Sequence, residues 1–119
     1  MWRCATACLL ILLALRPASA QERLAIPTGG YTREAIVYTS PSAQPRPLLI
    51  LLHGRFGTGA QVLRSASLRA QGYVLVAPDG VDRAWASGGN ATPADRAGVD
   101  DIAFLRTLVA EMVRRYRVD

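Results

Sequence analysis

An unbroken run of aliphatic residues that ends in a glycine-rich loop constrains this chain more than any other feature of its sequence. The run covers residues 48–52, and the stretch 48–59 reads LLILLHGRFGTG. A short apolar run bounded by Pro47 and by glycine is typical of a strand that is buried on both faces of a parallel sheet. Such a strand ends at a loop whose backbone N–H groups face a crevice, so the pattern indicates an α/β protein with a site at that loop.

The rest of the sequence alternates between predicted strands and helices. Residues 21–31 are predicted as a loop or a first edge, and 40–47 as a proline-rich turn. The stronger elements are strands 32–39 and 73–77, a helix over 60–71, a long loop over 81–97 and a helix over 100–116. This order predicts an α/β fold with a parallel-rich sheet flanked by helices. With two or three strands, both buried strands would lack neighbours, and residues 117–119 resemble a connector into another strand.

The helix over 100–116 has the clearest periodicity. Its apolar residues recur every three or four positions, with Leu108 and Val113 widening a stripe formed by Ile102, Leu105, Val109, Met112 and Tyr116. Acidic residues begin this helix and arginines 114, 115 and 117 end it, which suits the helix dipole. We therefore expect this stripe to face the sheet.

The first twenty residues are predicted to be a secretory signal peptide. Arg3 precedes the apolar run 5–15, and the small residues 18–20 form a cleavage site. Arg16-Pro17 interrupts the run before the roughly 20 apolar residues that a membrane span needs, so no stable span is expected after cleavage. Both cysteines lie in this segment, which leaves none from Gln21 onward. We expect an extracellular or periplasmic protein.

The charge of the chain argues against nucleic-acid binding. Its 14 basic residues are all arginine and exceed the 9 acidic residues, giving a formal net charge of +5. The arginines are scattered, whereas a nucleic-acid surface needs clustered basic residues with aromatic residues between them.

Two phosphate-binding interpretations of the glycine loop fail because required residues are missing. Gly54 and Gly59 have the separation of a P-loop, but Ala60-Gln61 stands where lysine and a hydroxyl residue are required. Gly57 and Gly59 match the first two glycines of a dinucleotide fingerprint, but Val62 occupies the third.

The remaining interpretation is an oxyanion loop. Acyl transfer forms a tetrahedral oxyanion, which preorganised backbone N–H groups stabilise. In α/β-hydrolases one donor comes from the loop that follows an early strand, and glycines let the main chain approach the substrate. The predicted donors are the N–H groups of Arg55 and Phe56. The predicted supporting residues are His53, Gly54, Gly57 and Gly59.

Four segments in this order resemble one family of secreted esterases. They are LLHGRFGTG at 51–59, GYVLVAPDG at 72–80, Trp85 with Gly89-Asn90, and VDDIAFL at 99–105. The set is similar to polyhydroxybutyrate depolymerases and to feruloyl and acetylxylan esterases. The resemblance implies a serine esterase without a cofactor, acting on a polyester or an ester-linked polysaccharide. It also implies that residues 21–119 are the N-terminal part of an α/β-hydrolase domain, with the Ser, Asp and His triad missing from this chain.

Individual residues receive roles from this resemblance and from local chemistry. In the family the catalytic base follows the nucleophile, so His53 is expected to brace the loop by hydrogen bonding. Trp85 and Asn90 are expected near the substrate pocket, with a hydrophobic plug under the long loop as the alternative for Trp85. Asp79 is expected in a turn. Asp100 and Asp101 stand at the start of the helix, and one of them is predicted to cap it through its side-chain oxygen. No metal site is expected there, because no His or Cys accompanies the two acids.

A different class of function remains open at this point. A chain without a nucleophile could be a non-catalytic secreted binding module, or the product of a decayed or truncated gene.

Overall fold

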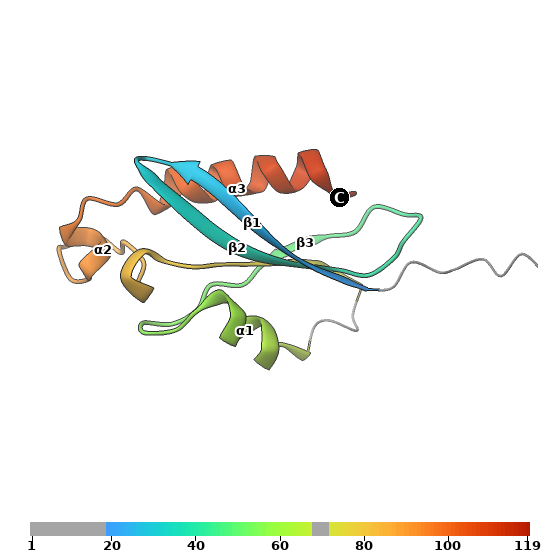
Figure 1. Cartoon of the computed structure of the whole chain (residues 1–119), viewed down its shortest axis with the longest axis horizontal. Coiled ribbons are helices and arrows are strands. Elements are labelled where there is room, and N and C mark those ends of the chain that lie inside the picture. The colour runs from blue at the N-terminus through green and yellow to red at the C-terminus, as the bar shows by residue number, and fades with distance from the viewer. Residues whose placement is uncertain (1–18, 68–71) are drawn as a thin grey trace, which may run out of the picture.

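The computed structural model describes residues 19–67 and 72–119, and places a four-stranded sheet between helices. The strand order is β1-β2-β4-β3. The strands are β1 (Ala20–Thr28), β2 (Tyr31–Thr39), β3 (Leu48–Ile50) and β4 (Val74–Pro78). The helices are α1 (Gly59–Ser65), η2 (Val81–Arg83), α2 (Pro93–Arg96) and α3 (Asp101–Arg115). Helices α1 and α3 lie on opposite faces of the sheet (Figure 1). Most of the predicted signal peptide, residues 1–18, lies outside the described residues.

The sheet is mixed. Strands β1 and β2 form an antiparallel hairpin, and β2 also pairs antiparallel with β4. Among the four strands of the described chain, only β3 and β4 pair in parallel, so the sheet is less rich in parallel pairs than predicted. The hairpin turns at Gly29-Gly30, where both φ angles are positive, as a tight two-residue turn requires. The region 21–31, predicted as a loop or first edge, therefore holds a nine-residue edge strand.

Strands β3 and β4, both predicted to be buried, differ in burial and in their place in the sheet. All five residues of β4 are buried, and the strand lies between β2 and β3. β3 is half-buried at the sheet edge and spans three residues, although Leu51 N–H continues the pairing with Val76 O at 2.9 Å. The expectation that both strands lack neighbours therefore applies to one side of β3 only.

Each face of the sheet has its own apolar core. Phe104, Leu108 and Met112 of α3 pack on one face with strand residues such as Val37 and Val76. On the other face, Leu63 of α1 packs with Ile36, Leu75 and Ala77. Neighbouring residues of β4 point to opposite faces, so this one strand contributes to both cores.

Helix α3 begins and ends within one residue of the prediction, but it is rotated relative to the predicted stripe. Ile102 and Val113 remain 62% and 60% exposed, and Val109 remains 38% exposed. The fully buried apolar residues of the helix are Phe104, Leu108 and Met112. The predicted stripe is correct for Leu105, Leu108, Met112 and Tyr116, which pack in or against the core. It is wrong for the three exposed residues, because the apolar residues cover more of the helix circumference than one sheet contact needs. No helix among the described residues is long and apolar enough to cross a bilayer.

The last residues return to the sheet next to β3. Arg46 N–H donates to Arg117 O at 3.1 Å, and Asp119 N–H donates to Arg46 O at 2.8 Å. This pairing is an isolated parallel bridge between Arg46 and Val118. Pro47 O and Leu51 N–H bond to β4, so Arg46 faces the other side of the strand because bonding directions alternate. The bridge therefore lies on the side of β3 away from β4.

Candidate active site

His53 is the buried anchor of the glycine loop. His53 is 5% exposed, and its Nε2 accepts the N–H of Gly80 at 3.0 Å. Its Nδ1 lies 2.7 Å from the carbonyl oxygen of Gly54. These two bonds fit the neutral imidazole with its proton on Nδ1, since Nε2 must accept and Nδ1 must donate. Both ring nitrogens are thus engaged, and His53 braces the loop as its place before the glycines indicated.

The loop itself is a tight turn. Gly57 N–H donates to Gly54 O at 3.0 Å, which makes Arg55 and Phe56 the two central residues. Phe56 has a φ of 65°, whereas Arg55 is not among the residues with positive φ. A turn with positive φ only at its second central residue is type II. A side chain on Gly57 would contact Gly54 O at 2.9 Å, so glycine is needed there.

The two predicted oxyanion donors have different positions in this turn. Phe56 N–H donates to Arg83 O at 2.8 Å, so the prediction of Phe56 as a donor was wrong. The physical reason is the turn geometry, which points this N–H toward the 81–84 segment. By contrast, the N–H of Arg55 has no acceptor among residues 19–67 and 72–119, and Arg55 is exposed. Of the two predicted N–H groups, only that of Arg55 is therefore left without a hydrogen bond in the described part of the chain.

A close contact at Gly59 fixes where the loop enters α1. A Cβ on Gly59 would overlap the carbonyl oxygen of Ala77 and lie 2.8 Å from its carbonyl carbon. Gly59 N–H donates to the carboxylate of Asp79 at 2.6 Å. Thr58 caps α1 by accepting the N–H of Gln61 at 3.2 Å. Asp79 was predicted only as a turn residue, but it holds the start of α1 against the end of β4.

Trp85 lies under the loop as a brace. Its indole N–H donates to His53 O at 2.9 Å, and the two rings are 5.1 Å apart. The side chain is half-buried and packs against the α3 core. This geometry matches the predicted plug under the long loop, and it gives the indole a polar partner as a buried tryptophan requires.

Asn90 lies on an exposed turn. Its φ is 60°, and it follows two glycines that also have positive φ. Asp95 closes this turn from α2 by accepting the N–H groups of Gly88, Ala91 and Thr92 at 2.8, 3.1 and 2.9 Å. A residue that tolerates positive φ serves the turn here, and the place of Asn90 near a substrate pocket stays a prediction. Thr92 and Asp95 form a capping box, whose Thr-x-x-Asp spacing is visible in the sequence.

The turn closed by Asp95 is expected to open in acid. Partial burial raises the pKa of Asp95, but hydrogen bonds from Thr92, Gly88 and Ala91 outweigh it and lower the pKa from 3.8 to about 2. Because the folded pKa lies below the unfolded one, these bonds stabilise the turn fully above about pH 4 and are lost as pH falls through 2. The amide NMR shift of Gly88 should therefore titrate near pH 2. A midpoint near 3.8 would contradict the bonding, and Asp95→Asn should abolish the transition.

The two neighbouring aspartates at the start of α3 have different roles. Asp100 is the N-cap and accepts the N–H of Ala103 at 2.9 Å. Asp101 does not cap the helix. It is 5% exposed and accepts Arg33 Nη2 at 2.8 Å and the N–H of Ala86 at 2.6 Å. The prediction that one of the two aspartates caps the helix is confirmed by Asp100, whereas Asp101 faces the sheet, where a buried arginine neutralises it.

Arg33 is the residue that sequence reasoning missed. It is 4% exposed, donates also to Asp79 O at 3.1 Å, and lies with its guanidinium carbon 3.9 Å from the centre of the Phe104 ring. The sequence did contain a signal for its burial. Arg33 is two and four residues from Ala35 and Val37, so all three side chains lie on the strand face that the α3 core covers. Arg33 and Asp101 thus connect β2, α3 and the segments that hold His53. No three metal-ligating side chains gather anywhere in the described residues.

Comparison with known proteins agrees with this arrangement. The structure of S-formylglutathione hydrolase (FrmB) from Staphylococcus aureus superposes with a TM-score of 0.63 over 86% of this chain and 42% of that chain, at 15% identity. This chain carries an α/β-hydrolase fold. A sequence described as "Putative esterase NocK", from Nocardia uniformis subsp. tsuyamanensis, is 31% identical over 98 residues. That match covers 76% of this chain but only 28% of the relative, and no family model matches.

Proposed function

We propose that this chain forms the oxyanion-loop portion of a serine carboxylic-ester hydrolase. The observation that carries the proposal is the exposed, unbonded N–H of Arg55, held in a turn that His53, Trp85 and Asp79 fix from below. The α/β-hydrolase fold and the similarity to a sequence described as an esterase support it. Preorganised donors of this kind accelerate acyl transfer because they need no reorganisation when the charge develops.

The proposed reaction follows the serine-hydrolase scheme. A serine hydroxyl oxygen attacks the ester carbonyl carbon while a histidine takes its proton, and an aspartate orients that histidine. The carbonyl oxygen becomes an oxyanion that accepts the N–H of Arg55 and the N–H of the residue after the nucleophile. The alcohol leaves with the proton from histidine, and water then releases the acid from the acyl-enzyme. Neither nitrogen of His53 is open for the base role, so another residue must supply it.

The finer assignments belong to the same proposal. The protein is exported through its first twenty residues, and its substrate is a polyester of the polyhydroxybutyrate type or an ester-linked plant polysaccharide. The ordered motifs of residues 51–105 and the signal-peptide pattern support these assignments. The loops that surround Arg55 in the folded enzyme would select between a hydroxyalkanoate and a feruloyl or acetyl ester.

The test is ester hydrolysis by the complete gene product that carries this chain. It should cleave a short p-nitrophenyl ester, and alanine in place of the serine in a Gly-x-Ser-x-Gly turn should remove turnover. Turnover that survives this substitution would contradict the mechanism. Parallel assays with 3-hydroxybutyrate oligomers and feruloyl esters separate the two substrate classes.

A further inference from the structure

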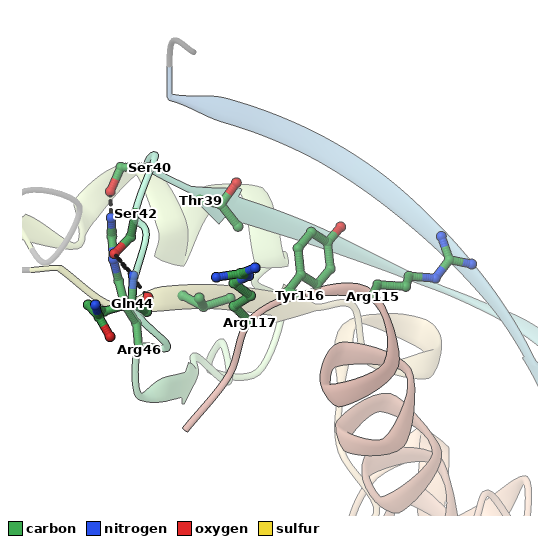
Figure 2. A pocket seen from close by; sticks show the side chains of 9 residues that line it. Thr39, Ser40, Ser42, Gln44, Arg46, Arg115, Tyr116 and Arg117 are labelled. Carbon is green, nitrogen blue, oxygen red and sulfur yellow. Dashed lines mark hydrogen bonds between the residues drawn. The ribbon is translucent and has the colours of Figure 1, made fainter. Parts of the chain in front are cut away.

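A second concave site lies at the opposite end of β3 and β4 from the His53 loop. Its cavity measures about 210 Å³, and it is bordered by Val74, the first residue of β4, and by Arg46, just before β3. Thr39, Ser40 and Ser42 line it from the turn after β2, and Tyr116 and Arg117 line it from the end of α3. Figure 2 shows these side chains around the 40–46 segment.

Arg46 contributes a charge that no carboxylate neutralises. Its guanidinium donates to the hydroxyl of Ser40 and to the carbonyl oxygen of Pro41, both of which are neutral acceptors. Among the described residues, no carboxylate oxygen lies within the 4.0 Å of an ion pair from Arg46. A guanidinium carries five N–H groups, so several donors of this half-buried side chain remain open.

Arg117 adds a second charge of the same kind. Its Nη1 donates to the carbonyl oxygen of Ala43 at 2.9 Å, and it forms no ion pair with any residue of the described chain. The backbones of Arg46 and Arg117 are hydrogen-bonded at 3.1 Å, so both side chains start from neighbouring positions and hold the same turn.

Arg115 also lines this pocket, but unlike Arg46 and Arg117 it forms ion pairs. It pairs with Glu111 at 2.9 Å and with Glu22 at 3.9 Å, and its side chain points away from Arg117 (Figure 2). Arg46 and Arg117 line the same pocket without a counter-charge among the described residues, and an anion bound in that pocket would supply one. The hydroxyl groups of Thr39 and Ser40 have hydrogens without an acceptor among the described residues, which adds two neutral donors.

We propose that this pocket binds the phosphate group of a small molecule. Two guanidinium groups and two hydroxyl donors suit an anion with several oxygens and a charge near −2, because guanidinium recognises phosphate through paired N–H bonds. The cavity has room for a phosphate group, and the ligand is either inorganic phosphate or a phosphate monoester. The site is independent of ester hydrolysis, since it lies at the other end of the strands.

The test is titration of the protein with phosphate at constant ionic strength, with chloride as the reference ion. Phosphate should raise the melting temperature, and calorimetry should give a saturable Kd. Arg117→Gln should weaken phosphate binding about tenfold, the loss expected for one charged hydrogen-bonding partner. The matched control is Arg106→Gln, which removes the same charge from an exposed residue of α3 far from this turn.

Each outcome decides the proposal. An equal loss in Arg117→Gln and Arg106→Gln would show an effect of net charge and overturn it, as would an absence of phosphate-specific stabilisation. If Arg46→Gln does not fold because its turn is released, Arg117→Gln still decides, since Arg117 is exposed and holds a single carbonyl. Glycerol phosphate that binds as tightly as inorganic phosphate identifies an organic phosphate as the ligand, and weaker binding identifies free phosphate.

Discussion

Asp101→Ala is expected to lower the free energy of unfolding by about 3–5 kcal/mol, because it leaves Arg33 buried without its counter-charge. Arg33 and Asp101 are 4% and 5% exposed and meet at 2.8 Å. The N–H of Ala86 loses its acceptor in the same variant. Urea denaturation followed by circular dichroism measures the loss. Against a total of roughly 5–15 kcal/mol for a typical domain, it is large enough to unfold a marginal one.

The neighbouring Asp100 offers a matched control. Asp100→Ala removes one carboxylate from the same helix end, but it deletes only a cap, which typically contributes about 1 kcal/mol. A cost for Asp101→Ala no larger than this would contradict the buried ion pair. The double variant Arg33→Met, Asp101→Leu removes both charges together and should recover much of the loss, because no unpaired charge stays buried.

Arg55→Pro should reduce ester hydrolysis by about 100- to 1000-fold in the complete gene product, the usual cost of one oxyanion donor. Proline removes the N–H of residue 55 and leaves the rest of the turn unchanged. Position 55 is the first central residue of a type II turn, where proline is favoured. Steady-state kinetics should show the loss in kcat, with the melting temperature close to that of the unaltered protein.

Arg55→Ala separates the backbone from the side chain. It keeps the N–H and removes only an exposed guanidinium, which lies 4.8 Å from the Phe56 ring centre. Near-normal turnover in Arg55→Ala together with the loss in Arg55→Pro would assign catalysis to the N–H. Equal turnover in both variants would contradict the oxyanion role of this residue while leaving esterase activity itself intact.

The parts of the fold that follow from local pattern were predictable. The apolar run 48–52 and the helix over 100–116 rest on sequence neighbours, and the structure has them close to where they were predicted. The bracing role of His53 was inferred from the family resemblance, and its contacts with Gly54 and Gly80 agree with it. The single-sequence signal for β1 was weak because residues 21–31 mix polar and apolar types. Its pairing with β2 depends on the Gly29-Gly30 turn.

What could not be predicted depends on contacts between distant segments. Arg33 and Asp101 are 68 residues apart, so neither sequence neighbourhood shows that they pair. The same holds for Phe56, whose N–H is taken by Arg83, and for the rotation of α3. Each of these errors arose where a local rule allowed two arrangements and a tertiary contact selected one.

The parallel bridge between Arg46 and Val118 sets a register for any further pairing along the open edge of β3. A segment that continued from Val118 in this register would advance one residue for each residue of β3. It would come level with His53 after about seven residues, or roughly 23 Å at the rise of a parallel strand. Its carboxyl end would then arrive beside the N–H of Arg55, so this one backbone pairing determines which residue of an incoming strand could share a substrate with the loop.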